Sequence, residues 1–168
     1  MACQGGRSRI DRVETAFFHQ GDSAGYPGLP SLDILGNVIP FIAGEEAKLE
    51  REPRKLLGSL GADGVTDAPF AVSAQCNRVP VADGHTACVS LAFARETRPE
   101  DAAKALASFQ AAPEIAALPS SPDPPLVVRD EPDRPQPVRD RDAGRGMAVS
   151  VGRIRRWAMP RTRKNTTL

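Results

Sequence analysis

Residues 70–95, FAVSAQCNRVPVADGHTACVSLAFAR, decide the fold of this chain. Apolar and polar positions alternate over residues 70–76 and again over 86–95, which is the two-residue period of a strand with one buried face. The linking run NRVPVADGH contains the Asp83-Gly84 pair, a signal for a turn. The segment therefore predicts two β-strands that pair with each other across this loop.

Two stretches on either side have helical patterns. Residues 44–60, GEEAKLEREPRKLLGSL, carry acidic residues early, basic residues late and leucines at helical spacing. Pro53 predicts a kink or a restart there, because proline lacks a backbone donor. Residues 99–110, PEDAAKALASFQ, begin with a proline and two carboxylates and are rich in alanine. We expect this second helix to pack on the strand pair.

The remaining chain is expected to contain two more strands and long loops. Residues 10–18, IDRVETAFF, and 146–154, GMAVSVGRI, have strand patterns. The apolar run at 32–42 is interrupted by a glycine and a proline, which predicts a buried irregular segment. Prolines exclude regular structure from 119–145 except for a short LVV run.

These elements predict the α+β fold class, with a mixed or antiparallel sheet and helices packed on one face. The 168 residues are about enough for one domain. No glycine-rich phosphate motif follows the first strand, so a complete Rossmann domain is not expected. The 16 prolines and 14 glycines indicate many turns and a modest core.

Charge and cysteine content limit the classes of partner. The net charge of +1 gives no overall field that would attract nucleic acid or anionic lipid. No run approaches the roughly 20 apolar residues of a membrane span, and the polar start lacks a secretory signal. Cys3, Cys76 and Cys88 have no metal-ligand spacing, and their odd number favours free thiols. We expect a cytoplasmic protein with no metal and with neither nucleic acid nor a membrane as partner.

Four residues are candidates for binding and proton transfer. Arg78 and His85 flank the predicted turn, where a guanidinium suits a carboxylate and an imidazole suits proton transfer near neutral pH. Glu52 and Lys55 lie three positions apart, on one face of the predicted helix. Spacing alone also allows a structural role for the first pair and a solvated ion pair for the second.

Three runs carry a resemblance to a known family. They are SAGYPGLPSLDILGNVIPFIAGEEAKLEREPRKLLGSL, VSAQCNRVPVADGHTACVSLAF and RPQPVRDRDAGRGMAVSVGRIR. In order and spacing they resemble the carboxy-terminal half of aspartate-semialdehyde dehydrogenases of the archaeal and fungal type. The resemblance covers residues 10–154, leaving 1–9 as a non-matching start and 155–168 as a non-matching basic tail. It implies the substrate-binding and dimerisation domain of the semialdehyde dehydrogenase and glyceraldehyde-3-phosphate dehydrogenase-like type, truncated at both ends.

The resemblance also implies an activity and roles for the four residues. Enzymes of this family use NADP to convert aspartyl phosphate to aspartate semialdehyde through a cysteine thioester, on the route to lysine, threonine and methionine. Arg78 matches the arginine that holds the substrate carboxylate, and His85 matches the general acid and base. Glu52 matches the acid that takes the substrate ammonium group, and Lys55 matches the lysine that contacts phosphate. A homodimer is implied as well.

The chain departs from the family pattern at its nucleophile. The family cysteine precedes the matching region, and Cys3 does not match its block. Cys76 is expected to be a small buried side chain. His19 stands where an active-site glutamine is expected, with Gln20 one position late. The chain alone is therefore expected to be inactive. Two alternatives to a fragment of an aspartate-semialdehyde dehydrogenase stay open: a non-catalytic dimerisation module, or a fragment of a malonyl-CoA reductase.

Overall fold

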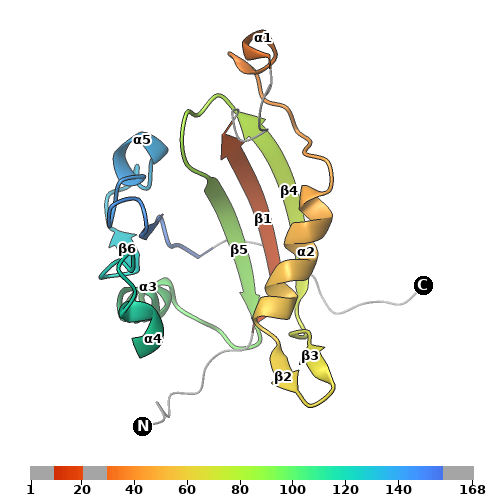
Figure 1. The fold of residues 1–168 in the computed structure, drawn as a ribbon, viewed down its shortest axis with the longest axis vertical. Coiled ribbons are helices and arrows are strands. Elements are labelled where there is room, and N and C mark those ends of the chain that lie inside the picture. The colour runs from red at the N-terminus through yellow and green to blue at the C-terminus, as the bar shows by residue number, and fades with distance from the viewer. Residues whose placement is uncertain (1–9, 21–29, 157–168) are drawn as a thin grey trace, which may run out of the picture.

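A three-stranded sheet forms the centre of the computed structural model, which describes residues 10–20 and 30–156. Strand β1 (Ile10–Gln20) lies in the middle, parallel to β4 (Ala71–Val79) and antiparallel to β5 (Thr86–Phe93). Figure 1 shows β1 between the other two strands. The mixed sheet confirms the predicted fold class.

The two strands of the 70–95 segment form as predicted, but the prediction that they pair with each other is wrong. Strand β1 separates them, because it hydrogen-bonds to β4 on one side and to β5 on the other. Crossing one strand requires a span of about 10 Å, twice the strand spacing, and six loop residues cover it easily. The turn signal at Asp83-Gly84 therefore marks a bend within a wider loop, where Gly84 has φ 93°.

The register places the apolar side chains on one face of the sheet. Residues opposite one another share a face because side chains alternate along a strand. This face carries Val13, Thr15 and Phe17 of β1, Val72, Ala74 and Cys76 of β4, and Ala87, Val89 and Leu91 of β5. Only three apolar residues in the described part of the chain are buried, namely Ala68, Phe70 and Cys76, and of these only Cys76 is fully buried. The core is modest, as the composition predicted.

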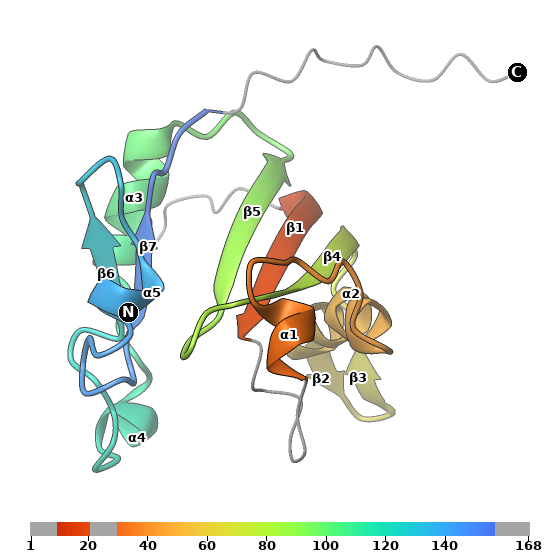
Figure 2. The same ribbon diagram turned by 90° about the horizontal axis from the view of Figure 1, so that it is seen from above.

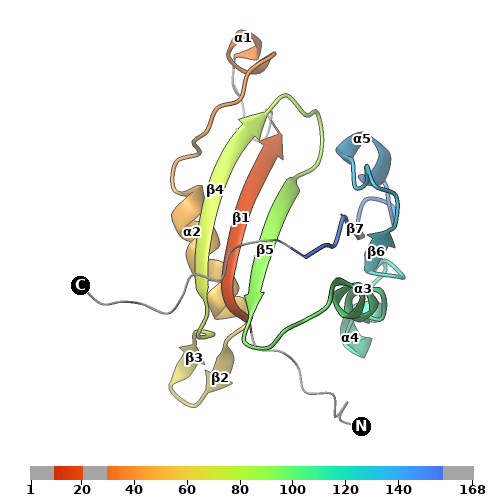
Figure 3. The same ribbon diagram turned by 180° about the vertical axis from the view of Figure 1, so that it is seen from behind.

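Helix α2 (Glu45–Leu56) covers the outer edge of β4. Glu46 accepts the backbone N–H of Cys76 at 3.0 Å, and Glu50 accepts that of Ala74 at 3.2 Å. These donors point away from β1 and would otherwise form an open strand edge. Figure 3 shows α2 running alongside β4.

The predicted helix at 44–60 ends earlier than expected. It passes through Pro53 as one element and stops at Leu56, so the predicted restart does not occur. Strand β2 (Ser59–Gly61) follows and forms a hairpin with β3 (Gly64–Thr66) that the patterns did not predict. A Cβ at Gly58 would lie 2.2 Å from the Thr66 carbonyl oxygen. The hairpin therefore folds back against the helix end at a point where only glycine fits.

The apolar run at 32–42 is not buried, so that prediction is wrong. The short helix α1 (Ser31–Ile34) begins it, and Leu32, Leu35 and Phe41 are 90%, 74% and 63% exposed. Its attachment to the sheet is a pair of backbone hydrogen bonds between Ile39 and Arg78. The isoleucines of the run, Ile34, Ile39 and Ile42, are half-buried, whereas its other large apolar side chains are exposed.

The last third of the described chain forms a second group beside β5, as Figure 2 shows. Its elements are α3 (Pro99–Ala107), α4 (Pro113–Ala116), β6 (Leu126–Arg129), α5 (Pro137–Asp140) and β7 (Val149–Gly152). Strands β6 and β7 confirm the LVV run and the final predicted strand, and they pair in parallel. Helix α3 packs on β6 and not on the predicted strand pair. Helix α5 also forms where only irregular structure was expected, with a proline in its first turn.

The edge contact of α2 gives a first prediction. Replacing Glu46 by Ala leaves the N–H of buried Cys76 without its acceptor, so we expect a loss of about 1–2 kcal/mol in the free energy of unfolding. Glu52→Ala makes the same change at an exposed position of the same helix and is the matched control. Urea unfolding and hydrogen exchange at the Cys76 amide measure the effect. Equal losses in both variants would show that the edge contact contributes nothing.

Candidate functional site

The ends of three strands meet where Arg78 and His85 lie. His19 is opposite Arg78 on one side of β1, and Phe18 is opposite Thr86 on the other. The strand spacing puts β4 and β5 about 10 Å apart across β1. An arginine and a histidine side chain at these two ends are long enough to contact one small ligand between them. The sheet thus brings together the two candidates that the sequence placed around a turn.

Arg78 and His85 are held in different ways. The N–H of Arg78 donates to the Ile39 carbonyl at 2.9 Å, and its own carbonyl accepts the Ile39 N–H at 3.1 Å. Arg78 is half-buried, whereas His85 is exposed on the loop between β4 and β5. Asp83 of that loop forms an ion pair with Arg141, the residue that follows α5. No pattern in the sequence connects the loop with residue 141.

The structure does not bring Glu52 and Lys55 to this strand end. Helix α2 runs antiparallel to β4, with Glu50 bonded to Ala74 and the Arg54 side chain bonded to the Ala68 carbonyl. Ala74 is already four residues, or about 13 Å, from Arg78 along the strand. Glu52 and Lys55 lie further along the helix in the same direction, with exposed side chains. Their substrate contacts stay predictions.

The cysteines of the described chain differ in environment. Cys76 is fully buried, and its burial, followed by the nearby carboxylates of Glu46 and Glu45, raises the pKa of its thiol. A nucleophilic cysteine needs the opposite shift. Cys88 is exposed, and both thiols are free. Cys3 lies outside the described residues, as do residues 21–29, where the sequence predicts a loop, and the side chain of His19 is not described.

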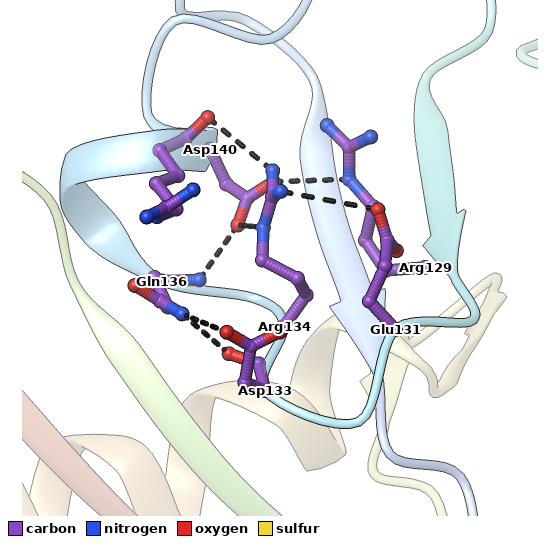
Figure 4. Close-up of polar contacts among 7 residues, drawn as sticks. Arg129, Glu131, Asp133, Arg134, Gln136 and Asp140 are labelled. Atoms are coloured by element: carbon purple, nitrogen blue, oxygen red, sulfur yellow. Dashed lines mark hydrogen bonds and ion pairs between the residues drawn. The ribbon is translucent and has the colours of Figure 1, made fainter.

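A cluster of charged residues stands in the second group, drawn in Figure 4. The carboxylate of Asp140, 5% exposed, accepts two hydrogen bonds from Arg134, one of them 2.7 Å long, and one of 2.6 Å from the Gln136 N–H. Arg129 Nε lies 2.9 Å from the same carboxylate. The Arg134 hydrogen bond outweighs burial and holds the pKa of Asp140 far below its usual range.

The Asp140 cluster is internally neutral. Glu131 lies 3.9 Å from Arg134, so two carboxylates balance two guanidinium groups. The Asp140 cluster therefore has no surplus positive charge that would attract a phosphate or carboxylate ligand. We therefore interpret the cluster as a clamp that fixes the proline-rich segment.

The described residues do not fit a metal or a dinucleotide. Within 10–20 and 30–156, no group of three or more His, Cys, Asp and Glu side chains is placed to hold a metal ion. A pyrophosphate binds at a helix N-terminus through free N–H groups and the positive end of the dipole. Helix α2 begins with Glu45 and Glu46, and α3 carries Glu100 and Asp101 in its first turn, so both ends repel phosphate.

The same described ranges contain no helix long and apolar enough to span a bilayer. The longest helix of the described residues, α2, has 12 residues, whereas a membrane span requires about 20.

The fold and the strand-end site define an α+β domain of the kind found in semialdehyde dehydrogenases. A family model described as the dimerisation domain of semialdehyde dehydrogenase matches residues 5–164. The chain belongs to this family. The match confirms the resemblance, and the narrower limits of 10–154 remain a prediction.

Curated aspartate-semialdehyde dehydrogenases are similar to this chain. An aspartate-semialdehyde dehydrogenase of Archaeoglobus fulgidus is 51% identical over 144 residues, covering 86% of this chain and 41% of the relative. One from Candida albicans is 46% identical over 154 residues, covering 87% and 42%. The chain thus spans about two fifths of the length of these relatives.

Solved structures agree with these relatives. The aspartate-semialdehyde dehydrogenase of Candida albicans, solved with NADP, has a TM-score of 0.76 at 43% identity, covering 87% of this chain and 42% of that one. The second aspartate-semialdehyde dehydrogenase of Vibrio cholerae has a TM-score of 0.65 at 23% identity, covering 87% and 45%, and supports the fold alone.

The cysteine environments give a second prediction. In a Cys3→Ser background, a thiol reagent at pH 8 is expected to modify Cys88 at once and Cys76 only after unfolding, because the Cys76 thiol is buried and its pKa is raised. Mass spectrometry of the labelled peptides measures the order. Adding Cys88→Ser should remove the fast phase, whereas rapid labelling of Cys76 in the folded chain would contradict the buried environment.

The clamp gives a third prediction. Asp140→Asn leaves Arg134 and Arg129 without their shared carboxylate, and we expect a loss of about 3 kcal/mol at pH 7. The folded pKa is lowered, so this stability is present above the unfolded value of about 3.9 and is lost as the pH falls below it. The gap between the two proteins should therefore shrink in acid.

Chemical denaturation between pH 2 and 7 tests the Asp140 prediction. Asp101→Asn is the control, since Asp101 also accepts two hydrogen bonds from one arginine, Arg98, but on the exposed surface. Solvent screening makes the expected loss in this control much smaller. A gap that stays constant down to pH 2 would rule out the ionised carboxylate as its source.

Proposed function

We propose that this chain is the substrate-binding and dimerisation part of an NADP-dependent aspartate-semialdehyde dehydrogenase, which converts aspartyl phosphate to aspartate semialdehyde. The observation that carries the proposal is the register of β1, which puts Arg78 and His85 around one strand end. The 51% identity to the Archaeoglobus fulgidus enzyme supports the same activity. A cytoplasmic location follows from a biosynthetic role with free thiols.

Arg78 is proposed to hold the substrate carboxylate. A guanidinium forms two parallel hydrogen bonds with a carboxylate, which fixes both position and orientation. The backbone of Arg78 is bonded to Ile39 through both its N–H and its carbonyl, so the side chain starts from a fixed point. The reacting carbonyl of the substrate is then directed toward the His85 loop.

His85 is proposed to accept the proton of the attacking thiol and to return a proton to the intermediate. Its exposed position on a loop leaves the imidazole accessible to substrate. The thiol itself is proposed to come from the part of the enzyme that this chain does not span. Glu52 and Lys55 are proposed to bind the ammonium and phosphate groups.

NADP is proposed to be held outside the described residues, since their helix N-termini are acidic. In the direction from aspartyl phosphate to aspartate semialdehyde, its reduced form, NADPH, would supply the hydride. A homodimer is proposed through the sheet and its surroundings. Val89 and Leu91 of β5 are 54% and 46% exposed, which leaves apolar surface for a second copy.

The exposed apolar surface also favours the non-catalytic dimerisation module as a second candidate. A malonyl-CoA reductase fragment is less well supported, because the matching relatives above are aspartate-semialdehyde dehydrogenases. One experiment distinguishes the three hypotheses, namely the dehydrogenase domain, the non-catalytic module and the malonyl-CoA reductase fragment.

A chimera gives the fourth prediction. Its carboxy-terminal segment comes from this chain, in place of the matching 144 residues of the Archaeoglobus fulgidus enzyme. We expect phosphate-dependent oxidation of aspartate semialdehyde with NADP. Arg78→Lys should raise KM roughly 100-fold, because a bidentate contact is lost. His85→Gln should lower kcat by about 10² to 10⁴. Glu52→Gln and Lys55→Met test the remaining assignments, and exposed Arg51→Lys is the control.

A folded, dimeric but inactive chimera would favour the non-catalytic module. NADPH-dependent reduction of malonyl-CoA, in place of activity with aspartate semialdehyde, would favour the malonyl-CoA reductase fragment. Circular dichroism and sedimentation establish folding and dimerisation before either conclusion is drawn.

A further inference from the structure

We infer that Asp83 and Arg141 form a positioning pair that holds the His85 loop against α5. The inference rests on the proposed function in assigning a catalytic consequence to the loop, but the contact itself is independent of any reaction. Arg141 Nη1 lies 2.6 Å from Asp83 Oδ2, and 58 residues separate them in the sequence. His85 follows Asp83 by two positions.

The loop backbone also lies near the end of α5. Gly84 has φ 93°, a conformation that glycine adopts without strain. A Cβ added at this position would just reach the Cβ atoms of Arg141 and Pro137, at 4.0 Å from each. The peptide before His85 therefore lies about one methyl group away from the segment that supplies Arg141.

Arg141 stands on a fixed base. Its N–H donates to the Pro137 carbonyl at 3.0 Å, and its chain neighbour is Asp140, the centre of the clamp. Asp140 is held by Arg134, Arg129 and the Gln136 backbone. Because Arg141 is one residue from this clamp, its backbone cannot shift without breaking several charge-assisted hydrogen bonds.

The loop by itself has little packing. Four of its six residues, Pro80, Ala82, Asp83 and His85, are exposed. The ion pair with Arg141 therefore contributes to the ordered position of the loop. The Asp83 and Arg141 side chains are 63% and 37% exposed, so solvent screens their attraction. Such a pair changes overall stability little, yet it shifts the population of one loop conformation several-fold.

The pair thus links two parts of the molecule. Asp83 belongs to the loop that joins β4 to β5, and Arg141 belongs to the second group, with β6, β7 and α5. The backbone of Arg78 is bonded to Ile39, and the His85 loop is bonded to Arg141, the residue after α5. The distance between the Arg78 and His85 side chains therefore depends on how the sheet and the second group meet. Asp83 and Arg141 are positioning residues and touch no substrate.

The fifth prediction tests the pair in the 168-residue chain. Asp83→Asn should speed hydrogen exchange of the amides at 82–86 by roughly 3- to 10-fold and change the His85 ring resonance, while the unfolding midpoint stays the same. The chain has two histidines, so the ring signals are readily assigned. Asp83→Arg combined with Arg141→Asp should restore slow exchange, and added salt should weaken the wild-type protection.

Asp130→Asn is the matched control, because Asp130 is an exposed aspartate of the second group and forms no ion pair with the described residues. Unchanged exchange in Asp83→Asn would overturn the positioning pair, and so would a fall in the unfolding midpoint that accounts for the faster exchange. Failure of the charge swap to restore protection would count against it in the same way.

The chimera separates this inference from the proposed function. There Asp83→Asn should lower kcat several-fold and alter its pH profile, with KM much less affected because Arg78 is untouched. Faster loop exchange with an unchanged kcat would refute the catalytic consequence and leave the dehydrogenase activity standing. An inactive chimera in which Asp83→Asn still frees the loop would refute the proposed function and leave the contact standing.

Discussion

The central position of β1 is the constraint on which the rest of the structure depends. It pairs with β4 on one side and β5 on the other, and so it creates both the apolar face and the strand end that carries Arg78 and His85. The outer edge of β4 stays closed because Glu46 and Glu50 accept its outward N–H groups and Ile39 pairs with Arg78. Without these acceptors the strand would offer an open edge to other chains.

Polar contacts compensate for a small apolar core in the second group. Six residues around Asp140 share hydrogen bonds and ion pairs over a proline-rich stretch in which long helices cannot form. A buried carboxylate with two arginines is costly to form and also costly to disrupt, so it specifies one arrangement of the segment. That arrangement brings Arg141 to the loop between β4 and β5.

The proposed site depends on both features. The chain belongs to the family of semialdehyde dehydrogenase dimerisation domains and spans about two fifths of the length of its relatives. The exposed apolar side chains of β5 and of the 31–41 segment agree with surfaces that a partner covers. Arg78 is fixed by the sheet, whereas the position of His85 is set by the neighbouring group.

The sequence by itself determined the elements whose signals are local. Alternation in 70–76 and 86–95, helical spacing in the first part of 44–60, proline at the first turn of α3 and the run over β7 all indicated the right type of element, because each depends on neighbouring residues. The family and the pair Arg78 and His85 also came from the sequence. Only the tertiary structure placed β1 between the predicted partners, exposed residues 32–41, moved α3 to β6 and joined Asp83 to Arg141. Those outcomes depend on contacts between residues tens of positions apart, and the local patterns of apolar, charged and turn-forming residues do not encode them.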